Sequence, residues 1–152
     1  MSVTLREITM ENFHACISLQ LTDEQKGFVA SNVYSLAEAK ADGISVPLAI
    51  YAEDAIVGFV MYWFDEDRHQ GHVERLMVDA RFQGRGHGRA AMKEVLHRLW
   101  SRPDCQAIQT SVAHANVAAE SLYASLGFRR TGETVNDGEE AVMLLDHQES
   151  HP

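Results

Sequence analysis

Apolar and polar positions change their spacing repeatedly along this chain, and each change marks a boundary between predicted elements. Alternating or continuous apolar runs predict strands at residues 3–8, 46–52, 55–64, 72–78, 107–112 and 140–145, with a further strand after Phe128. Apolar residues at helical spacing predict helices near residues 10–20, 35–40, 89–100 and 116–126. Polar turns at 52–54 and 136–138 are typical of hairpins. The pattern therefore predicts an α+β protein.

Hydroxyl residues and a glycine predict where the early helices begin and end. Thr9 is a candidate N-cap for the first helix, and Thr22 with Gln25 forms a capping-box pattern that begins a second helical piece. Ser35 is a candidate N-cap for the next helix, which Gly43 is expected to end.

Alternation along residues 72–78 predicts which side chains share a face of that strand. One face is expected to carry His72, Glu74 and Leu76, and the other Val73, Arg75 and Met77. In the preceding strand, Gly58 interrupts the apolar run, which indicates a bulge or a close approach of another backbone.

A glycine-rich turn joins the strand that ends near Val78 to the following helix. Its sequence, Gln83–Gly88 (QGRGHG), lets the backbone approach an anion with no Cβ in the way. The first N–H groups of a helix lack internal partners, and the helix dipole is positive there. Arg81, Arg85 and Arg89 surround the turn. The segment therefore predicts a pyrophosphate-binding site.

Two common phosphate-binding motifs do not fit this turn. A P-loop needs Gly-Lys-Ser/Thr after its spacer, and no such run occurs. A Rossmann fingerprint needs a third glycine where Arg89 stands. The remaining alternative is a glycine-rich loop that only caps a helix.

A longer pattern resembles motif A of the GNAT N-acetyltransferases: Leu76-x-Val78, then Gln83-x-x-Gly86-x-Gly88. The resemblance implies that the strand pairs with the pantetheine arm of acetyl-CoA and that the loop binds its pyrophosphate. It assigns cofactor binding to Leu76, Met77, Val78, Gln83, Gly84, Arg85, Gly86, His87, Gly88 and Arg89.

The stretch from Asn116 to Phe128 resembles motif B of the same family, in which an Asn begins a helix and a Tyr faces the thioester sulfur. The two motifs occur in the family's order, and the resemblance covers nearly the whole chain. It implies the GNAT acyl-CoA N-acyltransferase fold: an α/β/α sandwich whose mixed sheet has six to seven strands, with the central strands splayed. It also implies acetyl-CoA as co-substrate. No metal is expected, because no Cys/His spacing suggests a zinc site. Asn116 and Tyr123 join the expected cofactor contacts, although Asn116 is equally suited to capping its helix.

Acetyl transfer to an amine requires a neutral amine and a protonated leaving thiol. Tyr123 is the candidate general acid, and the alternative is a core aromatic residue. Glu74 is the candidate base, acting through water, or else an electrostatic partner for the ammonium. An unpaired carboxylate amid apolar neighbours is costly, which indicates a partner or a purpose, and a structural salt bridge is the alternative. His72 is a second candidate base. No cysteine lies in a motif that suggests an acyl-enzyme.

Residues 28–39 resemble a segment of bacterial GNATs that acetylate spermine and spermidine. The resemblance implies a primary amine acceptor, with a polyamine as the first choice. The candidate substrate-binding residues are Asn32, Tyr34, Tyr62, Phe64, His72 and Glu74. Alternatives are another small amine, a protein N-terminus or lysine, and a GNAT module that binds CoA without catalysis. A net charge of −9 suits a cationic substrate and disfavours nucleic acid.

The 152 residues suit one domain, residues 1–152, with a polar tail from about residue 147. No apolar run is long enough for a membrane span, and the N-terminus lacks a signal-peptide core. We therefore expect a cytoplasmic protein in which Cys16 and Cys105 are buried, reduced thiols. The oligomeric state is not readable from the sequence; homodimers are common in the family that it resembles, so a homodimer is one assembly that the resemblance allows.

Overall fold

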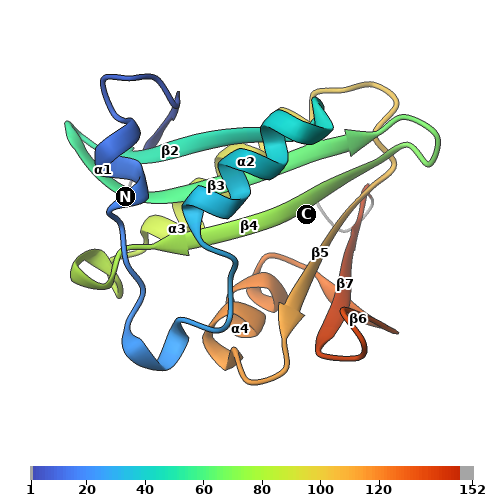
Figure 1. The fold of residues 1–152 in the computed structure, drawn as a ribbon. Helices are drawn as coiled ribbons and strands as arrows, with labels where there is room; N and C mark the ends of the chain where they lie inside the picture. Colours follow the sequence, from blue (N-terminus) through green and yellow to red (C-terminus); the bar gives the residue numbers. More distant parts are fainter. Residues whose placement is uncertain (1, 148–152) are drawn as a thin grey trace.

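Residues 2–147, the part of the chain that the computed structural model describes, contain one seven-stranded mixed sheet (Figure 1). The strand order is β1-β2-β3-β4-β5-β7-β6; β4 and β5 run parallel, and the other neighbouring pairs are antiparallel. The strands are β1 (Thr4–Glu7), β2 (Val46–Ala52), β3 (Ala55–Asp65), β4 (Gln70–Val78), β5 (Ala107–Ala113), β6 (Arg129–Val135) and β7 (Glu140–Asp146). The helices are α1 (Phe13–Ile17), α2 (Asn32–Asp42), α3 (His87–Trp100) and α4 (Val117–Ser125), with short 3-10 turns η1 (Asp23–Gln25) and η2 (Ala80–Phe82). The predicted mixed sheet and α+β class are confirmed.

Helices cover both faces of the sheet, as expected for a sandwich. α1 and α2 bury one cluster with β3 and β4, which includes Phe59 and Met77. α3 buries a larger cluster on the opposite face, in which Val95 and Leu99 are almost fully enclosed. A Cβ at Gly71 would meet the Leu99 side chain at 2.7 Å, so β4 needs a glycine there for α3 to pack this closely.

A β-bulge in β4 changes the side-chain alternation that the sequence predicts. In the β3–β4 register Met61 pairs with Arg75 and Tyr62 with Val73, so Glu74 has no partner. The extra residue lets Glu74 and Arg75 both reach the α2 side, where they contact Ser45 and Glu38. Leu76, expected beside Glu74, packs into the α3 cluster instead. The predicted alternation therefore holds through Glu74 and is wrong from Arg75 onward.

The two central strands separate part-way along their length. Pairing of the described β4 and β5 strands covers four residue pairs, from Gln70–Ala107 to Val73–Thr110. Thr110 Oγ1 donates a hydrogen bond of 3.0 Å to the Val73 carbonyl at the last pair. Beyond it the strands diverge (Figure 1), so the rest of β4 presents a backbone edge without a strand partner on that side. This is the splayed sheet that the resemblance implied.

Two of the predicted helix starts were displaced by several residues. α2 begins at Asn32, because extended Ser31 accepts a hydrogen bond from the Tyr34 N–H, whereas the predicted cap Ser35 is buried inside the helix. Asn12 rather than Thr9 precedes α1. The Thr22 capping box is present but begins only a single 3-10 turn, and Gly43 ends α2 in the left-handed conformation as predicted.

The structure bears on three further expectations: the state of the two cysteines, any membrane-spanning helix and the C-terminal tail. Cys16 and Cys105 are buried, unpaired thiols, and burial raises the pKa of Cys16 to about 11. Within residues 2–147, no helix combines the length and apolar character needed to cross a bilayer. Of the predicted tail, His147 packs against the Trp100 ring, and residues 148–152 lie outside the described part.

Candidate active site

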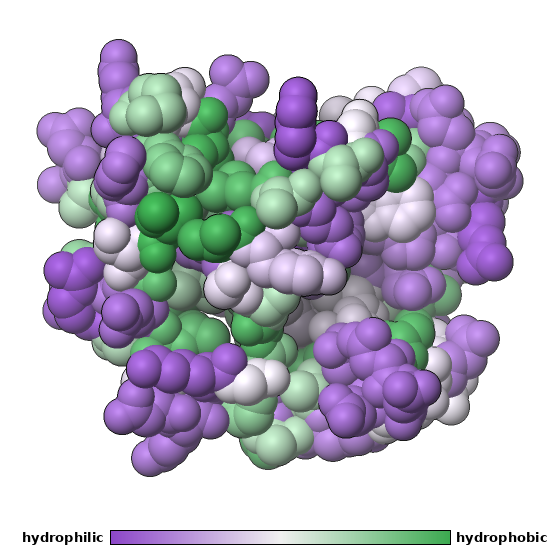
Figure 2. Space-filling view, viewed as in Figure 1, coloured by the Kyte–Doolittle hydropathy of each residue, from purple (hydrophilic) through white to green (hydrophobic). Residues whose placement is uncertain are grey.

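Two cavities of about 330 and 400 Å³ meet where β4 and β5 diverge. Phe28, Val29, Leu76, Asn116 and Ala119 line both cavities, so the two form one continuous site. Figure 2 shows this face of the molecule hollowed between the α2 side and the α4 side. We call the smaller cavity, which includes Glu74, the acceptor end, and the larger one, which includes the glycine-rich loop, the cofactor end.

Main-chain atoms form much of the cofactor end. Gly86 caps α3 with φ 86° and Gly84 has φ 77°, both in the left-handed region that a side chain disfavours. A Cβ at Gly84 would meet nothing within 4 Å. The glycines thus leave the N-terminus of α3 open to an anion, and the free β4 edge leads toward it. These features fit the pyrophosphate and pantetheine of acetyl-CoA.

Most of the residues predicted to bind the cofactor lie at this end. Those that line the cavity are Leu76, Met77, Val78, Gln83, Gly84, Gly86, His87, Gly88, Arg89 and Asn116. Arg85 is exposed and lies beside the Phe82 ring, 5.7 Å away, rather than in the lining. Arg81 pairs with Asp79 at 2.8 Å, and Arg89 donates a hydrogen bond to the Ser125 hydroxyl. His87 is buried at the start of α3, and its Nδ1 has no partner among the described residues.

Gln83 connects the cofactor loop to the segment between α1 and α2. Its Nε2 donates to the Val78 carbonyl at 2.9 Å and to Gln25 Oε1 at 2.8 Å, while Gln25 Nε2 donates back to Gln83 Oε1 at 3.2 Å. Phe28 and Val29, in the same segment, line both ends of the site. The amide pair therefore holds the wall shared by the two ends against the loop.

Tyr123 lies at the junction of the two strands and is 5% exposed. Burial raises the pKa of its phenol to about 12, and a hydrogen bond shared with Thr110 opposes this shift. The phenol is therefore protonated at neutral pH and lines the acceptor end, as a proton donor requires. Asn116 caps α4 by accepting from the Ala119 N–H at 3.2 Å and also lines both ends, so its two predicted roles are compatible.

Glu74 and His72 offer proton acceptors in the same cavity. Burial raises the pKa of Glu74, although Ser45 donates a hydrogen bond of 2.8 Å to Oε1 and Arg75 Nη1 lies 3.8 Å from Oε2. Burial lowers the pKa of His72, whose ring stacks on Trp63 at 4.4 Å. His72 Nε2 is enclosed without a partner among residues 2–147. Both shifts disfavour the charged form of the group.

The other predicted acceptor residues lie outside this cavity. Asn32 is buried and donates to the Cys16 carbonyl at 2.9 Å, which holds α1 to α2. Tyr34 is 58% exposed on the surface. Tyr62 and Phe64 pack against the α3 cluster on the opposite face, which Val60 shares in the regular alternation of β3. The structure does not bring these four side chains to the site.

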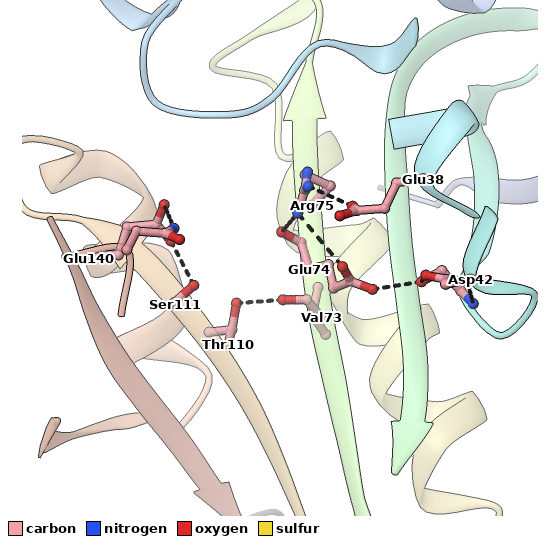
Figure 3. Close-up of polar contacts among 10 residues, drawn as sticks. Glu38, Asp42, Val73, Glu74, Arg75, Thr110, Ser111 and Glu140 are labelled. Atoms are coloured by element: carbon pink, nitrogen blue, oxygen red, sulfur yellow. Dashed lines mark hydrogen bonds and ion pairs between the residues drawn. The ribbon is translucent and has the colours of Figure 1, made fainter. Parts of the chain in front are cut away.

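Sequence reasoning missed a polar group on the opposite wall. Ser111 Oγ donates a 2.7 Å hydrogen bond to Glu140 Oε1, and Asn136 Nδ2 donates one of 2.7 Å to Glu140 Oε2. All three residues line the acceptor end. Figure 3 shows Glu140 and Glu74 on opposite sides of the gap between β5 and β4. The hairpin turn that places Asn136 was predicted, but nothing in the sequence indicated that it faces the site.

Comparison with protein-family models identifies the family of this chain. The model of the acetyltransferase (GNAT) family matches residues 5–128. The chain belongs to the GNAT family. A GNAT relative, the spermine/spermidine N(1)-acetyltransferase of Bacillus subtilis (strain 168), is 31% identical over 94% of this chain and 98% of its own length. The chain is an N-acetyltransferase with acetyl-CoA as co-substrate, as the resemblance implied.

Solved GNAT structures confirm the fold. The spermidine N-acetyltransferase of Vibrio cholerae, solved with CoA and spermine, matches with a TM-score of 0.76 at 17% identity, over 98% of both chains. The aminoglycoside acetyltransferase AAC(6')-Ib, solved with coenzyme A, matches with a TM-score of 0.80 at 20% identity, over 97% of this chain and 96% of its own. Across residues 2–147, no three His, Cys, Asp or Glu side chains converge to hold a metal ion.

Proposed function

We propose that this GNAT enzyme transfers the acetyl group of acetyl-CoA to a primary amine of a polyamine such as spermidine or spermine. The observation that carries the proposal is the pair of carboxylates, Glu74 and Glu140, that line the acceptor end from opposite walls. A polyamine carries ammonium groups along one flexible chain, so one nitrogen can react while another remains bound to a carboxylate. The 31% identical Bacillus subtilis relative supports the same substrate class.

The proposed chemistry is direct attack within a ternary complex. Glu74 accepts a proton from the acceptor ammonium, because only the neutral amine has a lone pair for attack on the thioester carbonyl carbon. The new C–N bond forms, the C–S bond breaks, and Tyr123 donates its phenolic proton to the departing sulfur. The raised pKa of Tyr123 keeps that proton available at neutral pH. The α3 N-terminus and the cofactor loop bind and orient the co-substrate.

Glu140 has a separate task in this proposal. Ser111 and Asn136 each donate to a different oxygen of Glu140, which fixes the carboxylate toward the cavity. It is therefore suited to binding a distal ammonium. A cytoplasmic location, a homodimer and a single domain over residues 1–152 stay predictions alongside this proposal.

The test is thiol release from acetyl-CoA with spermidine, spermine, a monoamine of matched length, aminoglycosides and a basic peptide. We expect the highest kcat/KM on the polyamines. Glu140→Gln should raise the KM for spermidine about tenfold, as loss of one charged contact implies, and leave the KM for acetyl-CoA unchanged. Glu139→Gln is the matched control, because its exposed side chain lies outside the lining. A monoamine turned over as efficiently as spermidine would refute the proposal, and preference for an aminoglycoside would replace it.

A further inference from the structure

A single hydroxyl lies between two carboxyl groups beside the acceptor end. Ser45 Oγ is 2.8 Å from Glu74 Oε1 and 2.6 Å from Asp42 Oδ2. A hydroxyl carries one proton and can donate to one of these oxygens. Both short contacts can be hydrogen bonds at once when one of the two carboxyl groups holds a proton, whereas with both ionised Ser45 donates to only one of them.

Surroundings decide which carboxyl group holds that proton. Asp42 ends α2 on the exposed surface, and its Oδ1 accepts hydrogen bonds from the N–H groups of Ile44 (2.8 Å) and Ser45 (2.9 Å). These bonds, led by the one from the Ser45 hydroxyl, lower the pKa of Asp42. Burial raises the pKa of Glu74. When the pair holds one proton, Glu74 therefore carries it and donates to Ser45, which donates to Asp42.

The other charged groups around Glu74 leave this order intact. Arg75 lies 3.8 Å from Glu74 Oε2 but forms its shorter contact, 2.8 Å, with Glu38 Oε1 on α2 (Figure 3). The negative charges of Glu38 and Asp42 disfavour ionisation of Glu74, whereas the positive charge of Arg75 favours it. His72, two residues away on β4, faces Trp63.

We propose that Glu74, Ser45 and Asp42 form a relay that carries the proton of the acceptor ammonium from the cavity to solvent. This inference rests on the proposed function, in which Glu74 takes that proton. Ser45 and Asp42 are then positioning and proton-transfer residues outside the cavity lining, and α2 has a chemical role as well as a packing role.

The relay conserves protons at each step. The ammonium N–H bond breaks as the Glu74 O–H bond forms, which leaves the neutral amine and a protonated Glu74. Glu74 then passes its proton to Ser45 Oγ while the original Ser45 proton moves to Asp42. Asp42 releases its proton to water, and the Ser45 hydroxyl turns back to its starting orientation. Because the pKa of Asp42 is low, it does not retain the proton.

The geometry depends on two local features of the fold. The bulge at Glu74 places two consecutive side chains, Glu74 and Arg75, on the α2 side of β4, whereas regular alternation would put them on opposite faces. Left-handed Gly43 turns the chain after α2, so that Ser45 folds back onto Asp42.

The decisive experiment compares Ser45→Ala, Asp42→Asn and the double variant by the pH dependence of kcat/KM for spermidine. Ser45→Ala removes a donor to the Glu74 carboxylate, so the pKa of Glu74 rises and the acidic limb moves to higher pH. Asp42→Asn can still accept from the backbone N–H groups, but its amide donates to Ser45, which then donates to Glu74. The acidic limb moves to lower pH. Both variants should lose about tenfold or more in kcat, and Ser45→Thr should restore it.

The double variant separates the relay from simple charge removal. In the Ser45→Ala background, Asp42→Asn should move the acidic limb much less than it does alone, because the hydroxyl that couples the carboxyl groups is gone. Equal shifts in both backgrounds, or a Ser45→Ala enzyme with unchanged kcat and pH profile, would overturn the relay.

A substrate-free measurement keeps this test independent of the acceptor's identity. Carbon-13 NMR of glutamate-labelled protein, with Glu74→Gln for assignment, follows the Glu74 carboxyl directly. We expect the same opposite shifts for the two single variants. If these shifts occur but no polyamine is turned over, the proposed function fails and the coupling stands; if polyamines are turned over without the shifts, the relay alone fails.

Discussion

The two ends of the active site are built by different means. The cofactor end uses main-chain atoms: two left-handed glycines, the N-terminus of α3 and an unpaired strand edge. The acceptor end uses side chains, chiefly Glu74 and Glu140, which contacts from distant elements hold in place. Backbone contacts suit a co-substrate that never changes, whereas exchangeable side chains suit an acceptor that differs between enzymes of one fold.

Substitution at Gly86 should break the cofactor end most severely. Gly86→Val places a β-branched side chain at φ 86° and in the path of the pyrophosphate, so we expect acetyl-CoA affinity to fall more than 100-fold. Isothermal titration with CoA measures this loss. Gly132→Val is the control, because Gly132 has φ 91° in β6 and lies away from both ends. It should cost stability yet keep CoA affinity; similar losses in both variants would contradict the assignment.

Tyr123 lines the acceptor end where β4 and β5 diverge, and its hydroxyl should affect turnover rather than binding. Tyr123→Phe should lower kcat about 10³-fold, the scale of a lost general acid, with CoA affinity within about twofold. Since the pKa of Tyr123 is raised to about 12, the wild-type kcat should show no alkaline loss from this group below about pH 11. Exposed Tyr34→Phe is the control. Unchanged turnover in Tyr123→Phe would remove this residue from the mechanism.

Glu74→Gln should affect the acceptor end alone, lowering kcat and raising the stability of the fold. We expect kcat to fall about 100-fold with unchanged CoA affinity. The folded-state pKa of Glu74 is raised, so ionisation costs folding free energy, and its contribution to stability is lost as pH rises through that pKa. The variant should therefore gain more in Tm, relative to wild type, at pH 8 than at pH 4. Calorimetry at the two pH values measures this, and an equal change at both would contradict it.

The smallest effect is expected at the wall that the two ends share. Gln25→Ala removes the amide pair with Gln83, worth about 1 kcal/mol, so acetyl-CoA affinity should fall about fivefold. KM for spermidine should rise as well, because Phe28 and Val29 lose their support. Exposed Glu24→Ala, one residue away, is the control. A change in only one of the two KM values would show that the wall does not link the ends.

The cofactor end could be predicted from the sequence because its geometry is local. The glycine spacing, the adjoining strand and the helix that follows all fall within residues 73–100, and the structure has them where they were expected. The hairpin turn at Asn136–Gly138 was predictable for the same reason: Asn136 and Asp137 adopt the positive φ values that such turns require.

The acceptor end could not be predicted in this way because distant pairing determines it. Glu74 contacts Ser45, 29 residues earlier, and the bulge in the β3–β4 register places Arg75 on the same side, against Glu38. Tyr62 and Phe64 lie on the opposite face with Val60, because β3 alternates regularly there and Phe59 and Met61 face the α2 side. The start of α2 was misplaced because Ser31 and Ser35 are equally good caps on propensity alone, and burial decides between them.

The short junction between β4 and β5 also has a consequence for local opening of the protein. Four residue pairs join the strands of β1–β4 to those of β5–β7 along the described sheet, so this seam should be among the first parts to open transiently. Backbone amides from Glu74 to Val78 that point into the gap should exchange with deuterium rapidly in the free enzyme. Bound CoA should slow that exchange and raise the unfolding temperature with the logarithm of its concentration over Kd. In the cell, the supply of cofactor would then govern how long this sheet stays closed and how well it resists proteolysis.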